Sequence, residues 1–158
     1  MKAASISEIK SGLKTKSPAE LTELCLRLGR FKKDNKELLT FLLFEADDLE
    51  NYISSVKEEM DGYFSEINTS SAFFVKKSLR KILRYTNKHS KYTGSKEAEI
   101  ALLLHFCTSY KGLKLPTHKA AALLNIYNSQ VKKLEAAITG MHEDLQHDYL
   151  RELDRLRG

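Results

Sequence analysis

Apolar positions recur at helical spacing along most of the chain, and one stretch is apolar on every side. Between Ile100 and Cys107, apolar residues occupy all faces of the helix predicted over Ala98–Tyr110. A helix that is apolar all round has to be covered by other elements. We therefore expect this helix at the centre of the fold. The run over Leu38–Phe44 is nearly as apolar and predicts a second buried helix.

The other helical segments carry apolar residues on one face only. Ser5 and Ser17 each begin a capping-box sequence, and Pro18 after the second suits a first helical position. No segment alternates apolar and β-branched residues in the manner of a strand. The sequence thus predicts an all-α fold of six to eight helices in a single domain over residues 1–158, with 141–158 as a peripheral C-terminal helix. Further caps or breaks are expected at Asp34 or Asn35, Asn68–Ser71, Ser95 and Lys111–Pro116, with Pro116 or Thr117 starting the next helix. Asp47-Asp48 either breaks a helix or lies on its exposed face, and Gly140 either kinks the last long helix or divides it from a final segment.

Two segments, 24–44 and 82–106, share a common plan. Each has an amphipathic helix, a basic turn, a capping residue, Lys-Glu and then an apolar helix. In this plan the chain resembles a short armadillo or HEAT-type helical repeat, which implies that pairs of helices stack side by side into an α-α superhelix. The offset near sixty residues is longer than the period of about 40–47 in those repeats. An irregular helical bundle is the alternative.

Composition and cysteine usage favour a cytoplasmic protein. The chain is 42% hydrophobic and 30% charged, as globular proteins are. It contains no apolar run long enough to cross a membrane and no signal-peptide pattern at its start. Cys25 and Cys107 lie among leucines on predicted helices, so we expect both to be buried, reduced thiols.

Charge is segregated along the sequence, although the net charge is only +5. Eight acidic residues and one lysine lie in Glu45–Glu66, whereas eight basic residues and no acid lie in Ile67–Lys96. At 100° per residue, many of these cations fall on one helix stripe, opposite the apolar residues. The stripe is the predicted partner-binding surface, and it comprises Lys76, Lys77, Arg80, Lys81, Arg84, Lys88 and Lys91.

Three interpretations of the stripe remain open. The acidic segment, packed antiparallel beside it, would neutralise part of its charge, although exposed pairs of that kind contribute only about 0–1 kcal/mol each. Alternatively, the stripe binds an acidic protein. In the third interpretation it binds phosphates of nucleic acid or anionic lipid, and Tyr92 adds stacking on a base. Identity of the partner and oligomeric state are left open by the sequence.

No motif for catalysis, metal or cofactor binding is found. His142 and His147 are five residues apart, about 140° around a helix, and so diverge, unlike the histidines of H-E-x-x-H. His105 lies in the apolar helix, where we expect a backbone carbonyl or hydroxyl to satisfy it. Glycines are at least seventeen residues apart, so neither glycine-rich nucleotide motif is present. We therefore predict a non-catalytic helical scaffold or adaptor, with no cofactor and no metal.

Overall fold

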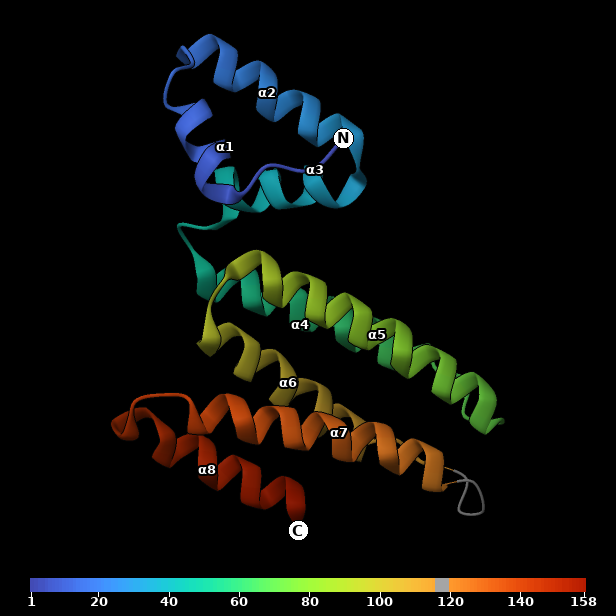
Figure 1. Ribbon diagram of the computed structural model, residues 1–158. Helices are drawn as coiled ribbons and strands as arrows, with labels where there is room; N and C mark the ends of the chain where they lie inside the picture. Colours follow the sequence, from blue (N-terminus) through green and yellow to red (C-terminus); the bar gives the residue numbers. More distant parts are fainter. Residues whose placement is uncertain (116–119) are drawn as a thin grey trace. The chain divides into compact units, whose positions relative to one another are not determined.

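The structure, a computed structural model, describes residues 1–115 and 120–158. Over these ranges the chain forms eight α-helices, one π-helical turn and no strand, which confirms the all-α fold of six to eight helices (Figure 1). Contacts divide the chain into two compact units, Met1–Glu45 and Ala46–Gly158, here called the N-terminal and C-terminal units. The single-domain organisation over residues 1–158 stays a prediction.

The N-terminal unit contains three α-helices, and the first two begin at the capping boxes that the sequence predicts. These are α1 (Ile6–Leu13) and α2 (Pro18–Phe31), whose N-cap serines accept from the third backbone amide of the helix. The third helix, α3 (Lys33–Thr40), has Lys32 at its N-cap, so the predicted cap at Asp34 or Asn35 is wrong. The chain then continues directly into a π-helical turn, η1 (Phe41–Glu45). Asn35 instead donates from Nδ2 to the carbonyl of Leu28 at 2.8 Å, which ties α3 to α2.

The prediction that Leu38–Phe44 forms a buried core helix is wrong. Phe41 is buried, but Leu42, Leu43 and Phe44 are 55%, 66% and 77% exposed. The helix also widens to a π-helical turn at Phe41, which rotates the following side chains relative to α3. An apolar run is buried only where another element covers it. Within this unit α2 packs closely against α3, whereas η1 has its close contacts with the adjoining α3.

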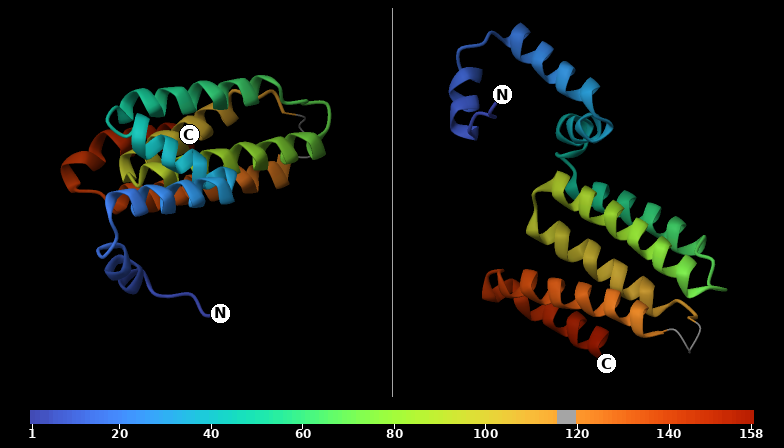
Figure 2. Two further views of the ribbon diagram at one scale, coloured as in Figure 1. Left: turned by 90° about the horizontal axis from the view of Figure 1, so that it is seen from above. Right: turned by 45° about the vertical axis from the view of Figure 1, so that its right-hand side comes forward.

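The described residues of the C-terminal unit form five helices, and four of them are arranged around the fifth. They are α4 (Leu49–Ser65), α5 (Ala72–Thr93), α6 (Lys96–Lys111), α7 (Ala120–Thr139) and α8 (Glu143–Arg157). Helix α6 contacts all four others and lies between the α4–α5 pair and the α7–α8 pair (Figure 2). The predicted helix start at Pro116 or Thr117 lies outside the described residues.

The side chains of α6 form the middle of this core. Ile100, Leu102 and Phe106 are fully buried, and the Phe106 ring lies 5.5 Å from that of Phe64 on α4. Each such side chain contributes about 1.5–3 kcal/mol relative to remaining in water. The prediction of a central helix over Ala98–Tyr110 is therefore confirmed.

Helices α4 and α5 run antiparallel, as the first of the three interpretations of the stripe had it, and a chain of aromatic rings joins them. The Tyr52 hydroxyl lies 2.6 Å from Nδ1 of His89, and the rings of Tyr63 and Tyr85 meet edge to face at 5.2 Å. Asp48 starts α4 as its N-cap and accepts from the Asn51 amide at 3.1 Å. Asp48 is therefore the cap, and the aspartate pair lies at the break between η1 and α4 and not within a helix.

Helix α8 begins after Gly140, which separates it from α7 as one of the two predicted alternatives had it. Its Leu153 and Leu156 are buried, and the Tyr127 hydroxyl of α7 donates to the Leu156 carbonyl at 2.7 Å. Lys111 of α6 donates to the Arg155 carbonyl at 3.1 Å. The C-terminal helix is thus anchored on α6 and α7. The resemblance to armadillo or HEAT repeats stays a prediction.

Candidate binding surface on helix α5

The seven predicted cations all lie on α5, and we call them the basic face. Lys77, Arg80, Lys81, Arg84 and Lys91 are exposed, whereas Lys76 and Lys88 are partly buried. The opposite side of α5 is fully covered, since Val75, Leu79 and Ile82 are at most 1% exposed. Burial of that apolar side fixes the rotation of the helix, and so the cations point outward.

Most of the basic face is not neutralised by the protein itself. Among the described residues, no carboxylate oxygen lies within 4.0 Å of the charged nitrogens of Arg80, Arg84 or Lys91. Lys81 is held differently, with its Nζ 4.9 Å from the centre of the Tyr63 ring on α4. A cation at this distance from a ring face is attracted to it but keeps its charge.

Acidic residues of α4 and of its C-cap gather on a neighbouring surface. Glu58, Glu59 and Glu66 line a hollow of about 450 Å³ together with Tyr63. Burial raises the pKa of the Tyr63 hydroxyl above its ordinary value, and the nearby Glu59 raises it further, while Lys88 acts in the opposite direction. Acidic and basic surfaces therefore adjoin near Tyr63.

At its C-terminal end, the basic face continues into a pocket of about 380 Å³, which we call the lysine pocket. Gly94 ends α5 with the left-handed φ of 60°, and Ser95 caps α6 by accepting from the Ala98 amide at 3.3 Å. This tight turn brings the end of α5 and the start of α6 together beside α7. The pocket is lined by Asn87, Ser90, Lys91, Gly94, Ser95, Lys96, Glu99 and Lys133.

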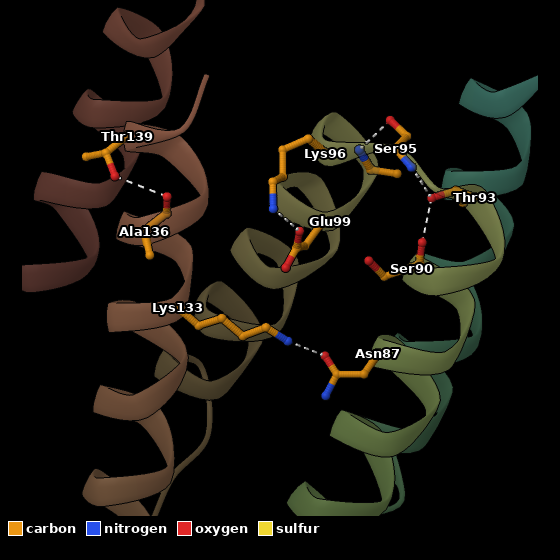
Figure 3. Close-up of polar contacts among 10 residues, drawn as sticks. Asn87, Ser90, Thr93, Ser95, Lys96, Glu99, Lys133, Ala136 and Thr139 are labelled. Atoms are coloured by element: carbon orange, nitrogen blue, oxygen red, sulfur yellow. Dashed lines mark hydrogen bonds and ion pairs between the residues drawn. The ribbon is translucent and has the colours of Figure 1, made fainter. Parts of the chain in front are cut away.

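The polar side chains of the lysine pocket come from three helices. Lys133 extends from α7 and donates to Oδ1 of Asn87 on α5 at 2.9 Å, while Lys96 pairs with Glu99 at 3.1 Å (Figure 3). With Lys91, the lining carries three ammonium groups and one carboxylate. A net positive hollow with hydroxyl and amide donors suits a carboxylate or phosphate group.

The sequence does not place Lys133 in this site. Lys133 and Asn87 are 46 residues apart, and no local pattern indicates that α7 lies beside α5. Lys96 belongs to the basic run, but its position at the start of α6 also depends on the turn. The only available signal is that Lys132 and Lys133 add charge to a helix of mixed composition.

The surroundings of His105 differ from the expectation. His105 is not satisfied by a backbone carbonyl or hydroxyl. It is partly exposed, and its Nε2 lies 2.6 Å from Oδ1 of Asp61 on α4. Because the two residues are 44 positions apart, the sequence gives no indication of the pair. No side chain acting as a nucleophile is found hydrogen-bonded to His105 among the described residues.

The remaining histidine and cysteine predictions have mixed outcomes. His142 is exposed and caps α8, accepting from the Asp144 amide at 3.3 Å. Both cysteines are free, but only Cys107 is buried; Cys25 is exposed, so the expectation that both are buried is wrong for Cys25. In the ranges 1–115 and 120–158, no three His, Cys, Asp or Glu side chains are grouped to hold a metal ion.

Comparison with known proteins does not assign the chain to a family. No family model, no curated protein and no solved structure matches the chain. Within the described residues, every helix is too short or too polar to cross a lipid bilayer.

Proposed function

We propose that this chain is a non-catalytic helical binding module and that the basic face of α5, together with the lysine pocket, binds an acidic protein. The observation that carries the proposal is the exposure of Arg80, Arg84 and Lys91 without carboxylate partners among the described residues. Uncompensated cations in a row attract an acidic surface at long range and so raise the association rate.

The lysine pocket adds specificity to that attraction. An exposed ion pair contributes only about 0–1 kcal/mol, so the basic face alone selects weakly among acidic ligands. A carboxylate entering the pocket, in contrast, meets ammonium groups of Lys91, Lys96 and Lys133 within one hollow of about 380 Å³. Several contacts within one hollow fix the orientation of a ligand, whereas separate contacts on an open surface do not.

The partial burial of Tyr92 favours an acidic protein over nucleic acid as the ligand of the basic face. Binding of single strands without sequence preference relies on exposed aromatic rings on which bases stack. Tyr92 is partly buried, and its ring meets that of His89 edge to face at 5.3 Å. Tyr92 therefore belongs to the chain of aromatic rings that joins α4 and α5. Nucleic acid, bound through phosphates alone, is the alternative ligand.

Charge reversal with a matched control tests the proposal. The variant Arg80→Glu/Arg84→Glu/Lys91→Glu is compared with Lys114→Glu/Lys132→Glu/Arg151→Glu, which changes the net charge equally at exposed positions outside the basic face. Binding of labelled poly-glutamate and of a labelled DNA duplex is followed by fluorescence anisotropy at two salt concentrations. Three attractive contacts become repulsive, so we expect poly-glutamate to bind the first variant about tenfold to a hundredfold more weakly.

Two outcomes would contradict the proposal. Equal weakening by both triple variants would mean that only net charge matters and that the basic face is not a site. Tighter binding of DNA than of poly-glutamate at physiological salt, lost only in the first variant, would assign the face to nucleic acid.

A further inference from the structure

A third hollow lies in the N-terminal unit, between α2 and the segment formed by α3 and η1. Its volume is about 640 Å³. Apolar side chains line part of it, and we call it the N-terminal groove. Three of these side chains remain accessible, since Leu26, Leu43 and Phe44 are 45%, 66% and 77% exposed. A cluster of large apolar side chains left in contact with water marks an interaction site more often than scattered single residues do.

The walls of the groove are held by close packing of α2 on α3. A Cβ atom on Gly29 would lie 3.0 Å from Cδ1 of Leu39, so the absence of a side chain permits this approach. Asn35 joins the same two helices through its hydrogen bond to Leu28. The groove therefore has a defined shape within the unit and does not depend on loop residues.

Cations surround the apolar part of the groove. Arg30, Lys32, Lys33 and Lys36 line it, and no carboxylate does. Arg30 lies 3.5 Å from Glu23, and Lys33 lies 3.9 Å from Glu37, outside the lining. The Arg30–Glu23 pair is 70% exposed on both sides, and such pairs are easily exchanged for others.

We propose that the N-terminal groove binds an amphipathic acidic helix of a partner protein. A helix that carries apolar residues at every third and fourth position fills an apolar groove, and acidic residues on its flanks would face the four cations. The concave form favours this ligand over a membrane surface, to which a helix presents a convex apolar face. This inference uses no residue of the basic face on α5 and is independent of the function proposed above.

A second copy of this chain does not offer such a helix from its most acidic segment. The apolar side chains of α4 are used inside the C-terminal unit, where Val56, Met60 and Phe64 are at most 8% exposed. Binding of α4 in the groove of another copy would require that unit to open. A partner of different sequence avoids this cost.

The test uses the full chain and a labelled peptide of about 16 residues, four helical turns, with leucine on one face and glutamate on the others. Two further probes are a peptide in which lysine replaces each glutamate and a peptide with the glutamate and leucine positions scrambled. Vesicles containing anionic lipid form a fourth probe. We expect only the acidic amphipathic peptide to bind, and raised salt to weaken its binding without abolishing it, because part of the contact is apolar.

Variants locate the binding site. Lys32→Glu/Lys36→Glu should weaken peptide binding about tenfold or more, and Leu43→Ser/Phe44→Ser should weaken it to a similar extent at high salt. All four side chains are exposed, and far-UV circular dichroism checks that the helices persist. The control Lys10→Glu/Lys14→Glu, in α1 and at its C-cap, changes the net charge equally and should leave binding unchanged.

Each contrary result overturns the inference. No binding of the acidic amphipathic peptide, equal binding of the scrambled peptide, or equal weakening by the α1 control would show that the groove does not recognise such a helix. Binding of vesicles without binding of the peptide would assign the surface to anionic lipid. Reversals on α5 test the other proposal alone, so failure of one leaves the other standing.

Discussion

Replacement of Phe106 by alanine tests whether α6 is the centre of the C-terminal unit. The Phe106 side chain is 0% exposed and packs against the ring of Phe64. Truncation removes its transfer free energy and leaves a cavity, which together cost about 3–5 kcal/mol in a well-packed core. Phe73 provides the matched control, because it is 69% exposed and only about a third of its burial energy, about 0.5–1 kcal/mol, is lost in Phe73→Ala.

The tyrosines allow the C-terminal unit to be observed separately. All seven tyrosines of the chain lie in residues 46–158, and the chain has no tryptophan. Urea unfolding followed by near-ultraviolet circular dichroism of tyrosine therefore reports on this unit alone. With an m-value of about 2 kcal/mol per molar, the expected loss for Phe106→Ala lowers the midpoint by about 2 M.

The comparison of the two phenylalanines decides the outcome. If Phe106→Ala lowers the free energy of unfolding by less than about 1 kcal/mol, or by no more than Phe73→Ala, the side chain is not in a packed core. The central position of α6 would then be refuted. An unchanged m-value in both variants is required for the comparison to hold.

Three further predictions concern backbone, thiols and pH. Gly94→Ala should destabilise the C-terminal unit by about 1 kcal/mol because its φ is +60°, whereas Gly62→Ala, in an exposed helix interior, should stabilise it by about 0.5–1 kcal/mol in the same urea assay. Titration with a thiol reagent should modify Cys25 in the native protein and Cys107 only after denaturation, and rapid modification of both would refute this assignment. Burial raises the pKa of Cys107 and of Tyr127 to about 12, from 9.0 and 10.0, so the folded state retains protons that the unfolded state releases. Stability should therefore fall as pH rises from about 9 toward 12, and a flat profile of urea midpoints over that range would contradict it.

Several elements followed from residues close together in the sequence. The serine caps at Ser5, Ser17 and Ser95 begin helices as predicted, and Gly140 ends one. A cap depends on a side chain and an amide within three positions of each other, so local sequence is sufficient. The rotation of α5 was also predictable, because its apolar and basic residues lie on opposite sides at helical spacing.

The sequence itself thus determined the all-α class, the helix starts at the serine caps and the outward direction of the α5 cations. Tertiary structure alone decided which apolar run is covered: α6 is surrounded by four helices, whereas Leu42–Phe44 remains exposed although its composition is similar. It also brought Lys133 to Asn87 and His105 to Asp61, pairs that are 46 and 44 residues apart. Periodicity identifies the face that a helix buries, but burial and pockets depend on which distant element packs against that face, and no local pattern specifies this.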